Sequence, residues 1–527
     1  AHMSSQVSRR SFVTGAVAGA TLAASAAPAF AATSVAPEAV TWDEEYDVVV
    51  VGYGAAGANA AINAADNGAK VLLIEKCAEG HEGGNSKYSG QGLQCFEDKE
   101  EALKYYKSLR GLFSTPSDAV IQAYADHIED MRDYLIFLGA EPENLDNYKG
   151  SGEPWRSKGE YPELDGAGHM LYYCVSGSSF DGAYYSLLQD NVAERSDLID
   201  VWFSAPGKHL VQDPQTQDIL GVEVEVDGAS KFVRAGAVVL ATGGFENNQQ
   251  MVQDYLQEPY VIPYGALENT GDGIVMAVEA GAELWHMGNA AGFLWCYKLP
   301  DADRGMPIRT ASMGIYVGPS GERFTCETQP TRHGRIPFAG RYEQNPSPLP
   351  CYFILDSASL ASGKILSVFS EGNVDEVEKG LFTVADTIEE LADKLADQLP
   401  VEVRRPNAPA TFQENFIATI QKWNEFCEAG EDARFLRPED TLTPIAEGPF
   451  YALELGIQMY NTQGGPVRDE TGHIVDRDGN PIPHLYSAGE LGAIWSDAYN
   501  GGGNLGECTA FGRISGANAA ADALSQA

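Results

Sequence analysis

One stretch near the amino terminus, residues 47–75, constrains the fold more than any other part of the chain. It opens with Val48 to Val51, an unbroken β-branched run that is typical of a strand buried on both faces of a parallel sheet. The pattern G-x-G-x-x-G follows directly, at Gly52, Gly54 and Gly57, and an alanine-rich segment with helical spacing comes next. A strand, this turn and a helix begin a Rossmann-like βαβ unit. The stretch therefore predicts an α/β fold class.

The same residues predict dinucleotide binding. The first glycine makes the tight turn, the second lets the backbone approach a pyrophosphate, and the third lets the helix pack on the strand. The helix begins at Ala55 and Ala56, whose free N–H groups and positive dipole end favour phosphate. A second apolar run, Val71 to Ile74, ends at Glu75, where a carboxylate is placed to accept hydrogen bonds from an adenosine ribose. We therefore prefer a dinucleotide site to a purely structural glycine turn.

Three further small-residue segments are candidates for cofactor contact. One follows the second strand at residues 83–92, one ends a buried strand at residues 237–245, and one begins a helix near residue 272. In these segments, and at Glu75 and Lys76, the predicted cofactor-binding residues are Gly84, Asn85, Ser86, Ser89, Gly90, Gly92, Ala241, Thr242, Gly243, Asn269, Thr270, Asp272 and Gly273. Asp272 lies near the positive end of its helix. No second G-x-G-x-x-G lies beside a strand, so a separate NAD(P)H domain is not expected.

Residues 1–31 have the features of an export signal. Residues 1–2 look like a cloning scar, and Ser8-Arg9-Arg10-Ser11-Phe12 is a twin-arginine pattern. Ala29-Phe30-Ala31 fits a small-x-small cleavage site. The apolar run between them is too short and too poor in bulky residues for a membrane anchor. We expect export by the twin-arginine route to a periplasmic, extracytoplasmic or cell-surface location.

Composition narrows the classes of partner. Acidic residues outnumber Lys and Arg by 75 to 35, a formal net charge of -40, so neither nucleic-acid binding nor stable membrane insertion is expected. The charge keeps an exported protein soluble and also suits a basic electron-transfer partner. The eight cysteines include no C-x-x-C pair, so no haem, iron–sulfur or metal site is predicted. We expect buried thiols instead of a disulfide framework.

The predicted elements change character along the chain. Residues 32–287 contain the βαβ unit and further buried strands, whereas residues 288–459 carry more proline, aromatic and irregular segments plus a helix around 389–398. Residues 460–527 resemble residues 32–287 again, with a strand near 485–490 and then a helix. We therefore expect an α+β domain inserted into a Rossmann-like domain.

Taken in order, six motifs resemble the flavoprotein family of fumarate reductases, succinate dehydrogenases and 3-ketosteroid dehydrogenases. They are VVVVGYGAAG, GGNSKYSGQG, VVLATGGF, NTGDGIVMAVEAGAEL, GERFTCE and SAGELG…GGGNLGECTAFGRISG. The resemblance implies FAD bound in extended form on the Rossmann-like domain, with the inserted domain capping the isoalloxazine ring. It also implies that Glu490, Gly503, Asn504 and Leu505 lie along the ribityl chain and pyrimidine edge. The histidine that links flavin covalently in succinate dehydrogenases has no counterpart, so we expect non-covalent FAD.

The resemblance implies an enzyme that acts on C=C or CH–CH bonds, but the substrate contacts of fumarate reductases are missing. Those enzymes hold dicarboxylates with two histidines and an arginine, where this chain reads GFLW from Gly292, YNTQGG from Tyr460 and AYNG from Ala498. Two buried carboxylates without ion partners are costly, so succinate and fumarate are poor candidates. Aromatic residues predicted to line a pocket for a ring-bearing substrate are Phe293, Trp295, Tyr460, Trp495 and Tyr499.

Tyr499 and Gly503 resemble the ketone-binding pair of 3-ketosteroid dehydrogenases, in which a phenol O–H and a backbone N–H donate to a carbonyl oxygen. The alternative is that Tyr499 only packs against flavin. The spacing from Tyr499 to Phe511 is one residue shorter than in the steroid pattern, which leaves the choice of N–H donor open.

Arg332 is the predicted proton donor. It follows GERFTCE, where fumarate reductases place their proton-donating arginine, although it lies one residue further from Glu327 than in that family. His333 and Arg335 are rivals for the role, and a plain surface basic run is the structural alternative.

The sequence therefore predicts an exported FAD-dependent ene-reductase that reduces the activated C=C bond of an enone-like ring compound, such as a 3-ketosteroid, by hydride transfer from flavin N5. An external protein or quinol-linked system would supply electrons. One alternative is a reductase of an aryl-acrylate or urocanate-type enoate, gripped by Arg309 or Arg341. Another is a 3-ketosteroid dehydrogenase working in the oxidative direction, and a third is a flavin carrier without a substrate pocket.

Overall fold

The glycine-rich stretch forms the βαβ unit that its sequence predicts. The computed structural model describes residues 34–156, 159–403 and 410–526, so the predicted export signal lies outside the described residues. Strand β1 (Glu44–Val51), helix α1 (Ala55–Asp66) and strand β2 (Val71–Ile74) follow one another, and the two strands are parallel. The two strands pair with each other, with Val48 opposite Val71.

An eight-stranded sheet surrounds this unit, in the order β20-β21-β8-β1-β2-β5, with β7 paired to β8 and β6 to β7. The added strands are β5 (Ile199–Trp202), β6 (Gly207–Gln212), β7 (Ile219–Val226), β8 (Ala229–Leu240), β20 (His473–Val475) and β21 (Pro481–Ser487). Strands β5, β2, β1, β8 and β21 are parallel, and β7–β8 is a hairpin turning at Asp227-Gly228. The last strands of the chain thus belong to the same sheet as the first, with β8 between β21 and β1.

Both faces of the sheet are buried. Val48 and Val50 belong to one hydrophobic cluster, and Val49 and Val51 belong to another on the opposite face. Alternate side chains of a strand point to opposite faces, so only a continuous apolar run satisfies two covered faces. This is the physical reason for the β-branched run in the sequence.

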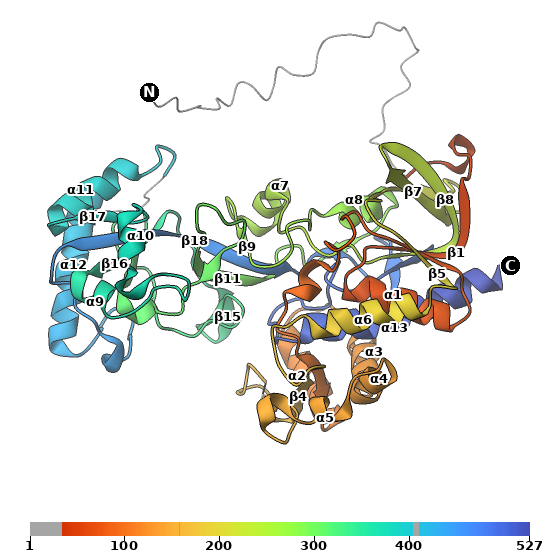
Figure 1. Cartoon of the computed structure of the whole chain (residues 1–527), viewed down its shortest axis with the longest axis horizontal. Coiled ribbons are helices and arrows are strands. Elements are labelled where there is room, and N and C mark those ends of the chain that lie inside the picture. Colours follow the sequence, from red (N-terminus) through yellow and green to blue (C-terminus); the bar gives the residue numbers. More distant parts are fainter. Residues whose placement is uncertain (1–33, 157–158, 404–409, 527) are drawn as a thin grey trace, which may run out of the picture. The chain divides into compact units, whose positions relative to one another are not determined.

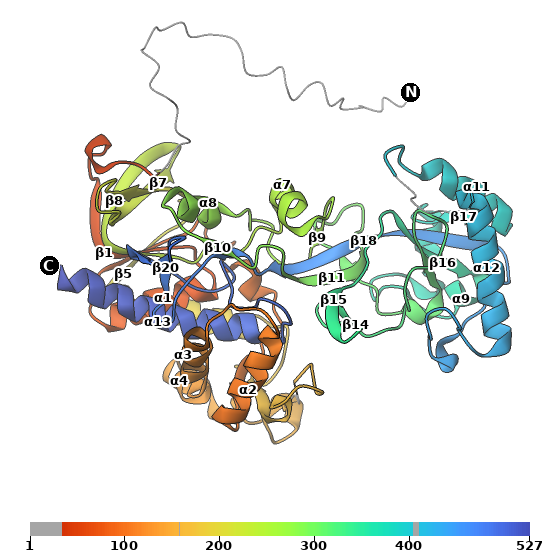
Figure 2. The same cartoon turned by 180° about the vertical axis from the view of Figure 1, so that it is seen from behind.

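Helix α13 (Gly503–Ser525) packs lengthwise on α1 (Figure 1). A Cβ atom at Gly516 would lie 2.2 Å from the Ala60 carbonyl oxygen, so the two backbones are too close for any larger residue there. Helix α3 contacts both α13 and α2, and the group α2–α4 lies beside α13 in both views (Figure 2). The other helices here are α2 (Lys99–Arg110), α3 (Asp118–Ile128), α4 (Met131–Phe137), α5 (Pro142–Leu145), α6 (Ala183–Glu194), α7 (Gln249–Met251) and α8 (Asp272–Glu279).

The second large sheet has seven strands. Its order is β12-β11-β18-β16-β13, and β9 and β17 also pair with β18. Its strands are β9 (Ile262–Pro263), β11 (Ala290–Tyr297), β12 (Met306–Pro307), β13 (Ile315–Val317), β16 (Cys351–Asp356), β17 (Thr383–Ala385) and β18 (Phe450–Thr462). Its helices are α9 (Ser357–Ala361), α10 (Val374–Glu378), α11 (Ile388–Gln398) and α12 (Phe412–Ala429). Short pairs complete the fold: β3 (Leu93–Phe96) with β4 (Met170–Tyr173), β10 (Leu284–Trp285) with β19 (Gly465–Pro466), and β14 (Arg335–Phe338) with β15 (Arg341–Gln344).

We refer to residues 288–459, predicted to be an inserted domain, as the cap. Ser34–Ala527 form one compact unit, and the boundaries at 287/288 and 459/460 stay predictions. Strand β9 joins the seven-stranded sheet from before residue 288, and β18 runs past residue 459.

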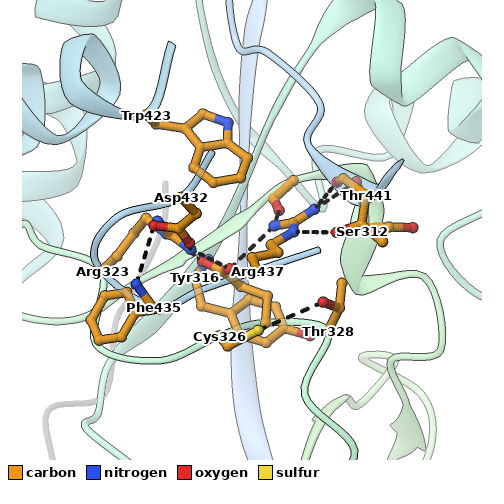
Figure 3. A network of polar contacts seen from close by, with 12 residues as sticks. Ser312, Tyr316, Arg323, Cys326, Thr328, Trp423, Asp432, Phe435, Arg437 and Thr441 are labelled. Atoms are coloured by element: carbon orange, nitrogen blue, oxygen red, sulfur yellow. Dashed lines mark hydrogen bonds and ion pairs between the residues drawn. The ribbon is translucent and has the colours of Figure 1, made fainter. Parts of the chain in front are cut away.

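A buried network of charges ties the cap together (Figure 3). Glu327 accepts hydrogen bonds from both Arg323 nitrogens, Nε and Nη2, at 2.7 Å each, and from Arg437 Nη1 at 3.1 Å. Arg323 Nη2 also donates to Asp432 at 2.9 Å. All four side chains are at most 2% exposed, and both guanidinium groups lie over the Trp423 ring. The two cations and two carboxylates balance, which is what allows them to be buried.

Because Glu327 is the carboxylate that both arginines share, its charge is the critical member of this network. We expect Glu327→Gln to lower the free energy of unfolding by about 3–5 kcal/mol, since it leaves a buried cation uncompensated. Denaturant unfolding of the FAD-loaded protein measures this. The control is Glu322→Gln, whose ion pair with Arg434 is exposed and 3.5 Å long. Equal unfolding midpoints for the two variants would contradict the assignment.

Candidate functional site

The first cavity lies where β1, β2 and β8 end. Predicted cofactor residues that line it are Gly52, Gly54, Ala55, Ala56, Glu75, Lys76, Gly84, Asn85, Ser86, Ala241, Thr242, Gly243, Asn269, Asp272 and Glu490. The carboxyl ends of parallel strands converge on one edge of a sheet, and ligands of such sheets bind there. The structure therefore brings most of the predicted cofactor residues to one place.

The remaining predicted cofactor residues do not line this cavity. They are Gly57, Ser89, Gly90, Gly92, Thr270, Gly273, Gly503, Asn504 and Leu505. Several of them support its wall: a Cβ at Gly57 would lie 1.8 Å from the Gly52 carbonyl oxygen, and one at Gly273 would lie 2.2 Å from Thr242 Oγ1. Thr270 Oγ1 accepts a hydrogen bond from Lys76 Nζ at 2.8 Å. These residues set close packing behind the cavity.

Other lining residues were missed by the sequence reasoning. They include Tyr53, Cys77, Gly83, Ala205, Pro206, Gly207, Glu268, Ala488 and Cys508. Ala205 to Gly207 follow β5, the sheet neighbour of β2, and no motif marks them. Tyr53, Gly83, Ala488 and Cys508 lie inside the motifs already quoted, so their place in those motifs is the signal that could have found them.

The chemistry of this cavity suits FAD. Glu75 is held at the end of β2 by the backbone N–H groups of Tyr53 and Cys77, at 2.9 and 2.8 Å, so its carboxylate is fixed where ribose hydroxyls can donate to it. Helix α1 starts at the cavity, where Ser86 Oγ accepts the Ala55 N–H at 3.1 Å and the N-cap residue, Gly54, contributes no side chain. The positive end of the helix therefore faces the cavity, where it favours phosphate. Thr242 Oγ1 is buried and has no hydrogen-bond partner within the described ranges. The residues present therefore fit a dinucleotide.

A pair of buried carboxyl groups stands beside the cavity. Asn85 Nδ2 donates to Glu246 Oε1 at 2.7 Å and to Glu490 Oε2 at 3.1 Å. Burial raises the pKa of Glu490 well above its usual value, and the neighbouring Glu246 raises it further. Burial also raises the pKa of Glu246. Burial and the charge of Glu246 both favour the protonated form of Glu490. Glu246 was not predicted, since an acid after GGF carries no recognised pattern.

The second cavity lies in the cap and has a volume of about 760 Å³. Phe293, Trp295 and Tyr460 line it, as predicted for a substrate pocket. Arg309, Arg332 and His333 line it too, together with Glu160 from outside the cap. The wall thus combines a few aromatic residues with more numerous polar and charged ones, which can orient a small molecule that carries a ring.

Trp495 and Tyr499 do not line the second cavity. Trp495 packs edge-on against Tyr124, with ring centroids 5.4 Å apart, and it lines a small separate hollow. Tyr499 packs between Trp495 and His333, at 5.8 and 4.8 Å. Tyr499 is thus one residue removed from the cavity wall, behind His333.

The predicted ketone-binding pair is not assembled as expected. The Gly503 N–H donates to the Asn500 carbonyl oxygen at 3.1 Å, within the turn that starts α13. The next N–H, that of Asn504, donates to the Tyr499 hydroxyl oxygen at 3.2 Å. The hydroxyl proton of Tyr499 stays available for another acceptor. The carbonyl-binding role of Tyr499 and Gly503 stays a prediction.

The turn Arg332-His333-Gly334-Arg335 joins the cap to acids from elsewhere in the chain. Arg332 pairs with Glu163 and donates to the Tyr342 hydroxyl at 2.7 Å. His333 Nε2 lies 2.7 Å from Glu160 Oε2, and Arg335 Nη1 lies 3.2 Å from Asp497 Oδ1. These half-buried, paired cations do not fit a solvated surface run. Glu160, Glu163 and Asp497 were missed because only the fold brings them here.

The His333–Glu160 pair is electrostatically matched. Burial opposes the charge of Glu160, but the charge of His333 and hydrogen bonds from His333 and Gly501 outweigh it and lower the pKa of Glu160. Burial likewise opposes the charge of His333, yet Glu160 raises the pKa of His333 above its usual value. Each group therefore stabilises the charged form of the other.

Three structural findings bear on other chemistry. No cluster of three or more His, Cys, Asp or Glu that would hold a metal is present in the described ranges. The eight cysteines are unpaired, and five of them are buried. Within the same ranges, no helix has both the length and the apolar character needed to cross a bilayer.

Comparison with known proteins supports FAD as the ligand of the first cavity. The sequence model of a family described as "FAD binding domain" matches residues 47–505. The chain is 27% identical to a vinyl phenol reductase of Lactiplantibacillus plantarum, over 90% of this chain and 95% of that protein. It is also 27% identical to a cytochrome-type fumarate reductase of Shewanella frigidimarina, over 90% of this chain and 77% of that protein.

The fold has solved counterparts. The 3-ketosteroid Δ1-dehydrogenase from Sterolibacterium denitrificans superposes with a TM-score of 0.70 at 22% identity, covering 91% of this chain and all of that one. The predicted α/β class and the resemblance to the fumarate reductase and ketosteroid dehydrogenase flavoproteins are confirmed. FAD is the cofactor.

Two glycines of the first turn separate packing from ligand binding. We expect Gly57→Ala to lose both stability and FAD, because its Cβ would collide with the Gly52 carbonyl oxygen. Gly54→Ala leaves its Cβ 3.5 Å from the nearest atom, the Gly83 carbonyl oxygen, so the apoprotein should fold normally while FAD binding weakens. Flavin absorbance after gel filtration and circular dichroism measure the two effects. Full FAD retention by Gly54→Ala would contradict the claim that the backbone at Gly54 contacts the cofactor.

Proposed function

The chain belongs to the FAD binding domain family and is an FAD-dependent oxidoreductase acting on C=C or CH–CH bonds, and we propose that it reduces a C=C bond conjugated to a carbonyl group on a ring-bearing substrate. An enone of the 3-ketosteroid kind is the first candidate. The observation that carries the proposal is the cap cavity of about 760 Å³, whose wall combines aromatic and polar residues and which meets the Tyr499 loop through His333 and Glu160. A flavin carrier has no use for such a cavity.

Bound FAD supplies a hydride from flavin N5 to one alkene carbon. The chain's own residues do the rest: Phe293, Trp295 and Tyr460 hold the ring and exclude water. The Tyr499 hydroxyl lies behind His333 and not in the cavity wall, so in this proposal the substrate carbonyl extends past His333 to reach it. The hydroxyl, whose oxygen already accepts from the Asn504 N–H, then donates to the carbonyl oxygen and stabilises the charge that develops there. Burial raises the pKa of Tyr499, so this hydroxyl keeps its proton at neutral pH.

A second candidate, reduction of an aryl-substituted enoate, is favoured by Arg309. It lines the cavity beside Tyr460 and pairs with no acid among the residues that the structure describes. Arg341, the other arginine considered, pairs with Glu343 on an exposed strand and lies outside the cavity. One unpaired cation suits one carboxylate, not two.

The proposal also covers the direction of the reaction, the source of its electrons and the location of the protein. A reductase needs an external electron donor, and the formal charge of -40 suits a basic carrier. The dehydrogenase direction is the alternative: anaerobic bleaching of the flavin by a saturated ketone would select it.

The substrate class is tested with dithionite-reduced protein under anaerobic conditions, following flavin reoxidation by enones, aryl-acrylates and vinylphenols. We expect enones to reoxidise the flavin and Tyr499→Phe to slow this by about 100- to 1,000-fold, because one donor to a developing oxyanion is lost. Tyr297→Phe is the matched control, since Tyr297 lies on β11 but packs on Phe369 outside the cavity. Reoxidation by enoates alone, with Arg309→Met raising their KM, would select the second candidate.

Export is tested separately. We expect the double change Arg9→Lys and Arg10→Lys to keep the protein inside the cell, because twin arginines are read as an address. Cell fractionation with immunoblotting measures this. An unchanged distribution would remove the twin-arginine route.

A further inference from the structure

We infer that His333, and not Arg332, delivers the proton in the proposed reduction, with Glu160 as its positioning residue. The inference rests on the proposed function and assigns the second hydrogen of that reaction. Three observations carry it: the place of the imidazole ring, the anchoring of Glu160, and the pairing of Arg332 with Glu163 and Tyr342.

The imidazole ring stands where the cap cavity meets the Tyr499 loop. His333 lines the cavity, and its ring meets those of Tyr499 and Tyr460 edge-on, with centroids 4.8 and 6.4 Å apart. Its side chain is 19% exposed. Nδ1 is buried and has no hydrogen-bond partner in the part of the chain that the structure describes. A buried donor without a partner is costly unless a ligand completes it.

Glu160 holds the other ring nitrogen. Its Oε2 lies 2.7 Å from His333 Nε2 and also accepts the Gly501 N–H at 2.7 Å. Its own N–H donates to Asn500 Oδ1 at 2.8 Å. The carboxylate is therefore fixed by the loop that carries Tyr499. A carboxylate on Nε2 keeps a proton there, so Nδ1 is the nitrogen that gains and loses the second proton.

With His333 as the donor, the protons and electrons of the proposed reduction balance. The substrate π bond is replaced by two C–H bonds: one alkene carbon takes the hydride, with its two electrons, and the other takes the proton from His333 Nδ1. The imidazolium becomes neutral imidazole, with its remaining proton on Nε2 facing Glu160. Solvent returns the proton to Nδ1 before the next turnover.

Arg332 already holds an acid and a phenol through one nitrogen, Nη1. Its guanidinium pairs with Glu163, donates to Tyr342 and lies over the Tyr161 ring at 4.9 Å. An arginine also stays protonated far above neutral pH, whereas histidine titrates near it. Arg335 is tied to Asp497 and Asn289. The contacts of both arginines hold the turn in place.

The pH dependence follows from the groups that face His333. These are Glu160 and Tyr499 from outside the cap, Tyr460 from β18, and Arg332 beside it in the turn. The donor form is the imidazolium, so turnover is full below the pKa of His333 and falls as pH rises through it. Glu160 raises that pKa. Removing the Glu160 charge therefore moves the fall in turnover to lower pH.

His333→Asn is the sharpest test, because His333 has φ +51°, a left-handed conformation that asparagine tolerates better than most residues. Asparagine keeps a polar group but supplies no proton at neutral pH. We expect turnover of FAD-loaded, reduced enzyme with enone to fall by at least about 100-fold. His209→Asn is the matched control, since His209 forms a similar pair with Glu279, 2.8 Å long, far from the cavity; its turnover should not change.

Glu160→Gln adds a readout independent of turnover. The His333 Cε1–H resonance, identified by its loss in His333→Asn, is titrated by NMR in wild type and Glu160→Gln. We expect its midpoint to move to lower pH in Glu160→Gln, together with the basic limb of the pH–rate profile.

The outcomes separate the two proposals. Wild-type enzyme that reduces no enone, enoate or vinylphenol overturns the proposed function, and the proton donor falls with it. Active wild type with His333→Asn equally active, or with Arg332→Lys losing as much as His333→Asn, overturns the inference alone. An unshifted His333 midpoint in Glu160→Gln overturns the role of Glu160.

Discussion

The contact between the turn at residues 332–335 and three acids is the interaction on which the arrangement of the site depends. Arg332, His333 and Arg335 each pair with a carboxylate that lies more than 150 residues away in sequence. Together with the packing of the His333 ring on Tyr499, these pairs join the cap cavity to the loop that carries Tyr499. The pairs are half-buried, so they are less screened than surface ion pairs and are sensitive to the loss of either partner.

The cofactor cavity depends on a different constraint, the close approach of backbones. Gly52 has φ +105°, and its Cβ would lie 2.3 Å from the Ala241 carbonyl oxygen. Only glycine allows β1 and β8 to end this close together beneath helix α1. The same logic recurs where α13 meets α1 at Gly512 and Gly516. Small residues thus fix the shape of the cofactor cavity through backbone packing alone.

Buried carboxylates are satisfied in two ways, by paired cations or by amide donors. In the cap, Arg323 and Arg437 are matched by Glu327 and Asp432, so the network is neutral and structural. Beside the cofactor cavity, Glu246 and Glu490 have no such cations and share amide donors instead. The GERFTCE motif therefore belongs to the first kind: its arginine and glutamate stabilise the cap, and the reactive candidates follow it.

The sequence by itself determined the βαβ unit and pointed to most of the residues that line the first cavity, and β20 and β21 lie in the same sheet as this unit. These follow from local patterns, because a β-branched run, a glycine turn and a helix start are each written in adjacent residues. Only the tertiary structure decided which residues meet at the second cavity. Trp495 was expected in the pocket but packs with tyrosines of α2 and α3, and Glu160 was not expected at all. Pairings such as His333 with Glu160 join residues far apart along the chain, and no local pattern encodes which distant acid a histidine will face.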